Sequence, residues 1–200
     1  ARDFVELPSQ FNEHWALDPA VLSHYAKHHK TGEPMPQALA DKLTATATFN
    51  QGYSLTEILG AAVLDMRWHS MPAGSTGQPA GPFEAGVLAQ AGLNLPQVPP
   101  RYRSSYFLHI WANGYEAGYY AYLWAEMLDN DAYQWFTEHG GLTRANGDRF
   151  RRMILSRGNA GDYAALYRAF RGQDPAIEPM LKRRGISAAA APVPTPAKRP

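Results

Sequence analysis

The sequence predicts an all-α fold. Alanine occurs 31 times, whereas the β-branched apolar residues valine and isoleucine occur six and five times. Alanine is the strongest helix former and β-branched residues favour strands, so this composition disfavours a protein built from sheets. Prolines, glycines and capping residues also recur between apolar segments, which is typical of a series of helices.

The length and the missing residue types limit the kind of protein further. Two hundred residues are enough for one sizeable domain. The sequence has no cysteine, which excludes a disulfide scaffold, a cysteine-ligated metal site and a thiol nucleophile. It also has no run of about eighteen apolar residues, so we expect no membrane span and no membrane partner. The chain starts without methionine or a signal-peptide pattern, and we interpret it as part of a longer, cytoplasmic protein, with a periplasmic location left open.

A stripe of apolar side chains predicts the first helix. The stripe consists of residues spaced i, i+3, i+7 and i+11, namely Phe4, Leu7, Phe11 and Trp15. Pro8 lies within this segment and must occupy a first helical turn or a kink. Glu6, Glu13 and Gln10 lie opposite the stripe, and the pattern alone predicts a solvated polar face there.

Start and stop signals define the next two helices. Asp18 and Pro19 predict an N-cap followed by the first helical residue, and Gly32 predicts the end of that helix. Pro36 starts another helix, which runs towards Phe49.

The middle of the chain alternates between helices and breakers. A capping box over residues 54–57 opens an apolar helix that extends to about Trp68. Gly- and Pro-rich segments at 70–82 and 95–100 flank a short helix over 83–91.

The second half begins with the densest aromatic stretch of the sequence. This stretch covers residues 106–136, contains a glycine-bearing segment at 113–118, and becomes helical from about Tyr119. Basic and capping residues then predict three further helices, over 146–157, 162–172 and 174–185. The final residues, 187–200, are an Ala/Pro-rich tail that we predict to be disordered, so the folded domain covers 1–186.

Charge is distributed unevenly along the chain. Residues 1–142 contain seven Lys/Arg and fourteen Asp/Glu, whereas residues 143–200 contain twelve and four. Two complementary faces of one fold account for this difference. The alternative is a nucleic-acid binder, but acidic residues separate the basic ones, and Arg101 and Arg103 lie in no RNA-binding motif. We therefore expect no nucleic-acid partner.

Histidines are the first candidates for a metal site. His24 and His28 are four residues apart on the helix predicted to end at Gly32, so both could face one zinc ion. The zinc-peptidase motif His-Glu-x-x-His is absent, and Tyr25 occupies the position of its glutamate. We therefore interpret the two histidines as part of a solvated helix face, with a zinc site as the alternative. Phosphate-binding and dinucleotide-binding motifs and the nucleophile elbow are absent too.

Three tyrosines in the aromatic stretch are spaced i, i+4 and i+7, and would share one face of a helix: Tyr115, Tyr119 and Tyr122. They could form an aromatic core stripe. Alternatively, they could line a cleft, where a phenol can donate a hydrogen bond to a developing oxyanion. Gly114 and Gly118 favour the second interpretation, because they weaken a helix and suit a backbone that bends or closely approaches a ligand. His109 lies just ahead and could act as a donor or an acid/base.

Four separated blocks of sequence carry a further signal. They cover residues 2–10 (RDFVELPSQ), 31–33 (TGE), 49–52 (FNQG) and 109–126 (HIWANGYEAGYYAYLWAE). Together they resemble the thimet-oligopeptidase family of zinc peptidases, and particularly its bacterial peptidyl-dipeptidase branch. The resemblance covers residues 1–186 and implies an all-α, zincin-type fold in which two halves flank a deep substrate channel. This chain would be the C-terminal part of that catalytic domain.

The resemblance also implies roles for individual residues. In this family a His-Glu-x-x-His helix supplies two zinc ligands and the general base, and the third ligand is a glutamate in an Asp-Phe-Val-Glu context, which corresponds to Glu6. Tyr122 would donate to the tetrahedral intermediate, and Tyr115 and His109 would assist in substrate binding or oxyanion stabilisation. Since the His-Glu-x-x-His helix is absent, the chain would supply one ligand to Zn²⁺ and no general base.

The function implied by the resemblance is that of a zinc metallopeptidase. The intact enzyme would hydrolyse short peptides and release C-terminal dipeptides, and the upstream half of the same enzyme would be the partner of this chain. Alone, the chain would be inactive and would bind zinc poorly, because a single carboxylate is not a metal site. A non-catalytic helical module that binds peptides in an aromatic groove is the alternative.

Overall fold

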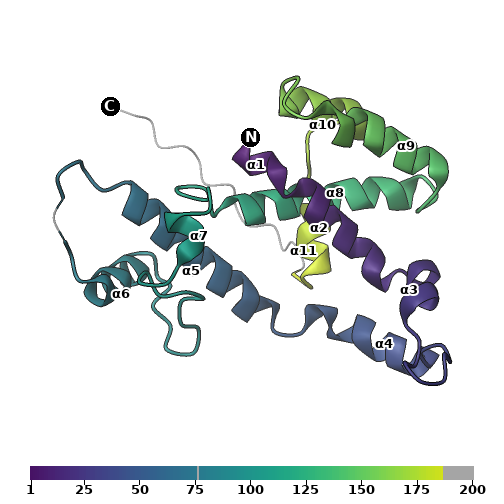
Figure 1. Ribbon diagram of the computed structural model, residues 1–200, viewed down its shortest axis with the longest axis horizontal. Coiled ribbons are helices and arrows are strands. Elements are labelled where there is room, and N and C mark those ends of the chain that lie inside the picture. The colour runs from purple at the N-terminus through teal and green to yellow at the C-terminus, as the bar shows by residue number, and fades with distance from the viewer. Residues whose placement is uncertain (76, 187–200) are drawn as a thin grey trace.

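The computed structural model describes residues 1–75 and 77–186, and it is built almost entirely from helices (Figure 1). The prediction of an all-α fold is confirmed. In this part of the chain, strand-like pairing occurs only at two isolated β-bridges, Lys27–Pro34 and Leu95–Val98. No helix among the described residues is both long enough and apolar enough to cross a bilayer. The tail predicted at 187–200 lies outside the described residues.

The helices follow one another along the whole described chain. The α-helices are α1 (Arg2–Val5), α2 (Leu7–Glu13), α3 (Pro19–Tyr25), α4 (Gln37–Ala45), α5 (Gln51–His69), α6 (Ala80–Gln90), α7 (Leu108–Trp111), α8 (Ala121–Glu138), α9 (Arg144–Met153), α10 (Tyr163–Arg171) and α11 (Glu178–Arg183). The described chain also contains three short 3₁₀ helices, η1 (His14–Leu17), η2 (Thr46–Thr48) and η3 (Leu155–Arg157).

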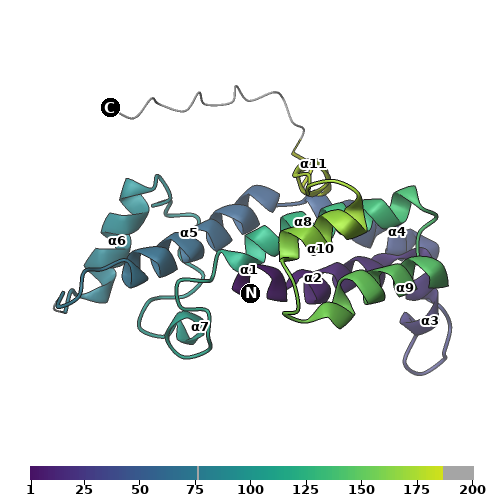
Figure 2. The same ribbon diagram turned by 90° about the horizontal axis from the view of Figure 1, so that it is seen from above.

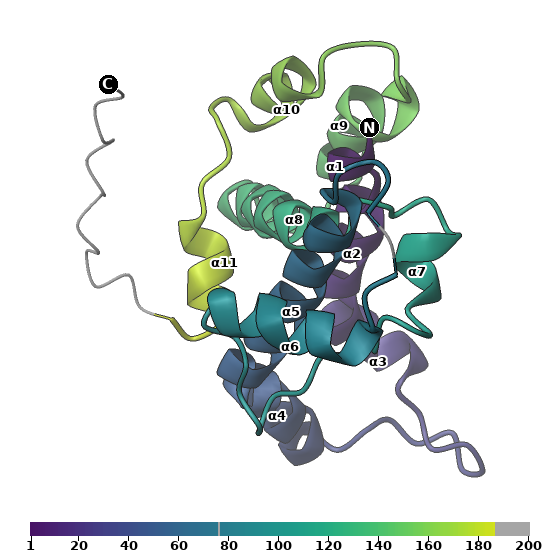
Figure 3. The same ribbon diagram turned by 90° about the vertical axis from the view of Figure 1, so that its left-hand side faces the viewer.

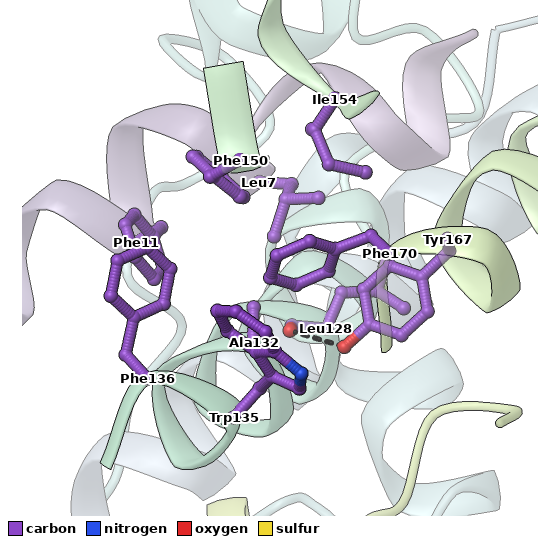
Figure 4. Packing of buried hydrophobic residues seen from close by; sticks show 10 residues of the cluster. All are labelled: Leu7, Phe11, Leu128, Ala132, Trp135, Phe136, Phe150, Ile154, Tyr167 and Phe170. Atoms are coloured by element: carbon purple, nitrogen blue, oxygen red, sulfur yellow. Dashed lines mark hydrogen bonds between the residues drawn. The ribbon is translucent and has the colours of Figure 1, made fainter. Parts of the chain in front are cut away.

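Helix α8 is the central element of the fold. It packs against α1, α2 and α11, with α9 and α10 on one side and α4 on the other (Figures 1 and 3). Ten buried residues form the core between α2, α8, α9 and α10 (Figure 4), namely Leu7, Phe11, Leu128, Ala132, Trp135, Phe136, Phe150, Ile154, Tyr167 and Phe170. The Phe11 ring lies 4.4 Å from Phe150 and 5.0 Å from Phe136, measured between centroids, so α2 is held firmly on α8.

A second core cluster holds α7 against α5. It consists of Ala61, Ala62, Phe107, Ile110 and Tyr119. The Tyr119 ring meets Phe107 edge-to-face at a centroid distance of 4.9 Å. Because Tyr119 lies two residues before the start of α8, this cluster places α7 and the segment before α8 next to α5.

The first predicted helix is interrupted at Glu6. α1 ends at Val5 and α2 begins at Leu7, with Pro8 in its first turn, so two short helices replace one. The apolar stripe is used as predicted, because Leu7 and Phe11 are buried in the core. The interruption leaves Glu6 at the junction of the two helices.

The helix predicted to end at Gly32 is shorter than expected. α3 ends at Tyr25, and Lys27 pairs with Pro34 as an antiparallel bridge. Gly32 adopts a φ of +73° in the turn of this hairpin, which only glycine does without strain. The glycine signal was correct, but it marks a hairpin turn and not a helix end.

Two other boundaries also differ from the prediction. The capping box expected over 54–57 lies inside α5, because Asn50 takes up a left-handed conformation and the helix starts directly after it. The last helix begins at Glu178, later than predicted. The N-caps at Asp18 and Asp162 are confirmed, and each side chain accepts a backbone N–H of the first helical turn.

A buried hydrogen-bonded cluster connects η1, α8 and α11. His14 Nε2 lies 2.7 Å from Asp129 Oδ1, and the Arg183 guanidinium contacts the other ring nitrogen. Burial, reinforced by Arg183, lowers the pKa of His14 to about 3. Burial also raises the pKa of Asp129 to about 8, so at neutral pH the pair holds a single proton.

This pair predicts how stability depends on pH. The reference pKa values for the unfolded chain are 6.5 for His14 and 3.8 for Asp129. Between those values the pair binds one proton in both states and contributes no pH dependence. From pH 6.5 to about 8 only the folded state keeps its proton, so stability falls as pH rises. We expect urea unfolding to show this decline, and Asp129→Asn to reduce it; an equal decline in both proteins would contradict the assignment.

Candidate active site

The four residues predicted to carry chemistry meet at one place. Glu6 comes from the junction of α1 and α2, His109 from α7, Tyr115 from the segment before α8, and Tyr122 from the first turn of α8. α1 lies against the N-terminal part of α8 (Figure 2), which brings these elements together. The Tyr115 hydroxyl donates a hydrogen bond to a carboxylate oxygen of Glu6. His109 Nε2 lies 2.7 Å from the Tyr122 hydroxyl.

The aromatic rings of the site are stacked. The Tyr115 ring lies 4.7 Å from the His109 ring and 5.1 Å from the Tyr122 ring, nearly parallel to both. Tyr119 meets Tyr122 edge-to-face at 5.2 Å. The three tyrosines would share one face only if the whole region were helical, and they do not, because α8 begins at Ala121. Their rings nevertheless meet, since the segment before the helix folds back over its first turn.

Glu6 provides a half-buried carboxylate at the edge of this stack. Ser9 Oγ donates to Glu6 Oε2 at 2.7 Å, and Tyr115 donates to the other oxygen. No basic group among the described residues forms an ion pair with Glu6. Two hydroxyls therefore orient the carboxylate in place of an ion pair. A carboxylate held in this way suits a metal ligand, since ligating carboxylates are themselves hydrogen-bonded by neighbouring groups.

The described residues contain no group of three histidine, aspartate or glutamate side chains that could hold a metal ion. The alternative zinc site at His24 and His28 fails for a specific reason. His24 lies on α3, whereas His28 lies in the hairpin beyond it, where its Nδ1 accepts from the Thr31 backbone N–H at 3.2 Å. The two imidazoles therefore do not share a helix face.

Tyr122 keeps its proton at neutral pH. Burial and the negative charge of Glu6 raise the pKa of Tyr122 to about 12. The Tyr122 carbonyl also accepts a hydrogen bond from Gln10 Nε2 at 3.1 Å, which ties α2 to the start of α8. The phenol is thus a positioned neutral donor.

The Arg2 side chain packs closely against the two glycines of the segment, Gly114 and Gly118. Its guanidinium carbon lies 4.3 Å from the centroid of the Tyr115 ring. A Cβ at Gly114 would lie 2.8 Å from an Arg2 nitrogen, and one at Gly118 would lie 2.9 Å from Arg2 Cγ. The side chain that lies close to both glycines is therefore Arg2, whose part in the site the sequence did not reveal, while the close approach to a ligand stays a prediction.

Asp65 of α5 is a second residue that sequence reasoning missed. Its side chain is fully buried and accepts the backbone N–H groups of Ala117 at 2.9 Å and Tyr119 at 2.8 Å. An acidic residue within the apolar helix predicted to run from the capping box at 54–57 to about Trp68 was the available signal.

Six of the seventeen Lys/Arg residues in the described part of the chain form ion pairs with acidic side chains. Ion pairs in the described part of the chain include Arg103–Glu84, Arg144–Asp148, Arg171–Asp131 and Arg184–Glu126. Two of these join the basic C-terminal region to the acidic helix α8. These two contacts link part of the basic region to the acidic helix α8 within one fold.

Comparison with known proteins shows one consistent family. A family model described as peptidase family M3 matches residues 1–186. The chain is 57% identical over 185 residues to the dipeptidyl carboxypeptidase of Salmonella typhimurium and 54% identical over 186 residues to that of Escherichia coli. It is 36% identical over 187 residues to oligopeptidase A of Escherichia coli. These matches cover 92–93% of the chain but only 27% of the length of each relative.

Proposed function

Because the chain belongs to peptidase family M3, we propose that it supplies part of the active site of a zinc peptidase that releases dipeptides from the C-terminal end of short peptides. The resemblance found in the sequence is confirmed at the level of the family. The convergence of Glu6, His109, Tyr115 and Tyr122 is the observation that carries the proposal. The dipeptide product is supported by the two relatives named dipeptidyl carboxypeptidase, which exceed 50% identity.

Glu6 would hold zinc together with groups outside these 200 residues. The Glu6 carboxylate fits this role, because its oxygens are oriented by Ser9 and Tyr115 and no basic residue of the described chain forms an ion pair with it. A His-Glu-x-x-His helix of the full-length enzyme, meaning the family-length polypeptide that contains this chain, would supply the other protein ligands and the general base. Bound zinc polarises the scissile carbonyl and acidifies water.

Tyr122 would stabilise the oxyanion that forms when the peptide carbonyl is attacked. With the Nε2–H tautomer, His109 donates to the phenolic oxygen of Tyr122 and leaves the phenol proton free for the substrate. Tyr115 donates to Glu6 and therefore orients the carboxylate, while its ring supports that of Tyr122. A donor fixed before the reaction needs no reorganisation when charge develops, which is the source of its catalytic effect.

The products of peptide cleavage test this function. We expect the full-length enzyme to remove successive dipeptides from the C-terminal end of a short synthetic peptide, and to do so equally well when the N-terminus is acetylated. Mass spectrometry identifies the products. Activity should be lost on treatment with a zinc chelator and return with zinc. Release of single residues, or of dipeptides from the N-terminal end, would contradict the proposed product, and zinc-loaded protein that binds the peptide without cleaving it would support the non-catalytic alternative.

A further inference from the structure

Asp65 is an unusual residue for its place in the fold. It lies within α5 beside the buried residues Ala61, Ala62 and Leu64, and it is itself fully buried. A buried charge is tolerated only when it is well paired or hydrogen-bonded. Asp65 meets this requirement through backbone groups that lie more than fifty residues away in sequence, at positions 117 and 119.

The two oxygens of Asp65 serve different residues of the same segment. Oδ1 accepts the N–H of Ala117 at 2.9 Å, and Oδ2 accepts the N–H of Tyr119 at 2.8 Å. His69 Nδ1, one turn further along α5, lies 2.8 Å from Oδ1 and 2.9 Å from the Asp65 backbone carbonyl oxygen. Asp65 therefore holds the backbone between Tyr115 and α8 through two hydrogen bonds.

The segment that Asp65 holds needs support, because its backbone is strained at Ala117. Ala117 has a φ of +53°. A non-glycine residue in the left-handed region is disfavoured, and it persists only where the surrounding structure determines it. The hydrogen bond from Ala117 to Asp65 is such a determinant.

We propose that Asp65 is a positioning residue, which sets Tyr115 and Tyr122 relative to Glu6 by holding the backbone of residues 117 and 119. Tyr115 precedes the first held residue closely, and Tyr122 follows the second within one helical turn. Asp65 itself touches neither Glu6 nor the phenols. This inference rests on the proposed function for its effect on catalysis. The two hydrogen bonds from the backbone to Asp65 are a structural claim that can be tested separately.

The substitution Asp65→Asn is the sharpest probe. It keeps the size of the side chain but replaces one acceptor oxygen by an NH₂ donor. One of the two backbone N–H groups must then face a donor, so one hydrogen bond is lost and the segment is free to shift. A displacement of about 1 Å at an active site can lower the rate about 10²-fold.

Asp131 offers a matched control. It is also fully buried, and its carboxylate accepts hydrogen bonds from Tyr167 and Arg171, which join α8 to α10 and not to the segment before α8. Asp131→Asn thus makes the same chemical change in an equally buried network. A merely structural effect of losing a buried carboxylate should appear in both variants.

The experiment compares both variants in the full-length enzyme, with kcat and KM expressed per folded molecule. We expect Asp65→Asn to lower kcat by about 10²-fold with a much smaller change in KM, and Asp131→Asn to keep kcat close to that of the wild type. Residue-resolved hydrogen exchange should show faster exchange of the Ala117 and Tyr119 amides in Asp65→Asn alone. A kcat equal to the wild type despite faster exchange would overturn the positioning role.

The two hydrogen bonds to Asp65 can also be tested without any variant. In the wild-type enzyme the amides of Ala117 and Tyr119 should exchange more slowly than that of the exposed neighbour Glu116, and equally fast exchange would overturn the proposal even if Asp65→Asn fails to fold. An inactive wild-type enzyme in which the amides of Ala117 and Tyr119 are protected from exchange would instead overturn the proposed function. The hydrogen bonds to Asp65 would then still be supported.

Discussion

Replacing Tyr122 by phenylalanine in the full-length enzyme should lower kcat by about 10²–10³-fold, the range typical for removing one oxyanion donor. The reason is that the hydroxyl is the only part of the side chain removed. The ring remains stacked on Tyr115 and packed against Tyr119, so folding and substrate binding should change little. Steady-state kinetics on a short peptide, together with the thermal unfolding midpoint, measure both effects.

Tyr133→Phe is the control for this experiment. Tyr133 lies on the same helix, α8, but its ring stacks on His14 and lies away from the aromatic stack of the site. Removing its hydroxyl should leave kcat near the wild-type value. If Tyr122→Phe behaves in the same way, Tyr122 is part of an aromatic core and not of the catalytic machinery.

The second large effect is expected for Glu6→Gln, which should weaken zinc binding by about 100-fold or more. Loss of a group that merely supports a ligand already lowers affinity about 10–100-fold, and Glu6 is proposed to be the ligand itself. The amide keeps the shape of the side chain but loses its charge and one of the oxygens that Ser9 and Tyr115 orient. Zinc content after dialysis against graded chelator concentrations measures the change.

Glu13→Gln provides the matched comparison for Glu6→Gln. Glu13 lies at the end of α2 and is exposed, and the sequence alone placed it on the same polar face as Glu6. It should retain zinc as well as the wild type does. Equal zinc retention by all three proteins would remove Glu6 from the set of ligands.

Local features of the chain were readable from the sequence because they depend on neighbouring residues. The N-caps at Asp18 and Asp162 and the apolar residues Leu7 and Phe11 lie where capping chemistry and helical spacing predicted them. The end of α3 was misjudged because Gly32 suits a helix end and a hairpin turn equally well. Only the backbone pairing across that hairpin distinguishes the two.

The candidate site depends on contacts that no local pattern encodes. Tyr115 and Glu6 are 109 residues apart, and Asp65 and Ala117 are 52 residues apart. The family resemblance assigned roles to Glu6, Tyr115 and Tyr122, but it did not reveal that Tyr115 holds the carboxylate of Glu6. It also gave no role to Asp65, whose partners are backbone amides and leave no mark of their own in a sequence.

The most direct test of the account is the position of the metal in crystals of the full-length enzyme, located by anomalous diffraction at the zinc absorption edge. We expect a single peak about 2.0–2.2 Å from a carboxylate oxygen of Glu6, the distance of a zinc–carboxylate bond, with the Tyr122 hydroxyl facing the same cavity. A zinc peak coordinated elsewhere, with Glu6 outside its coordination sphere, would contradict the account.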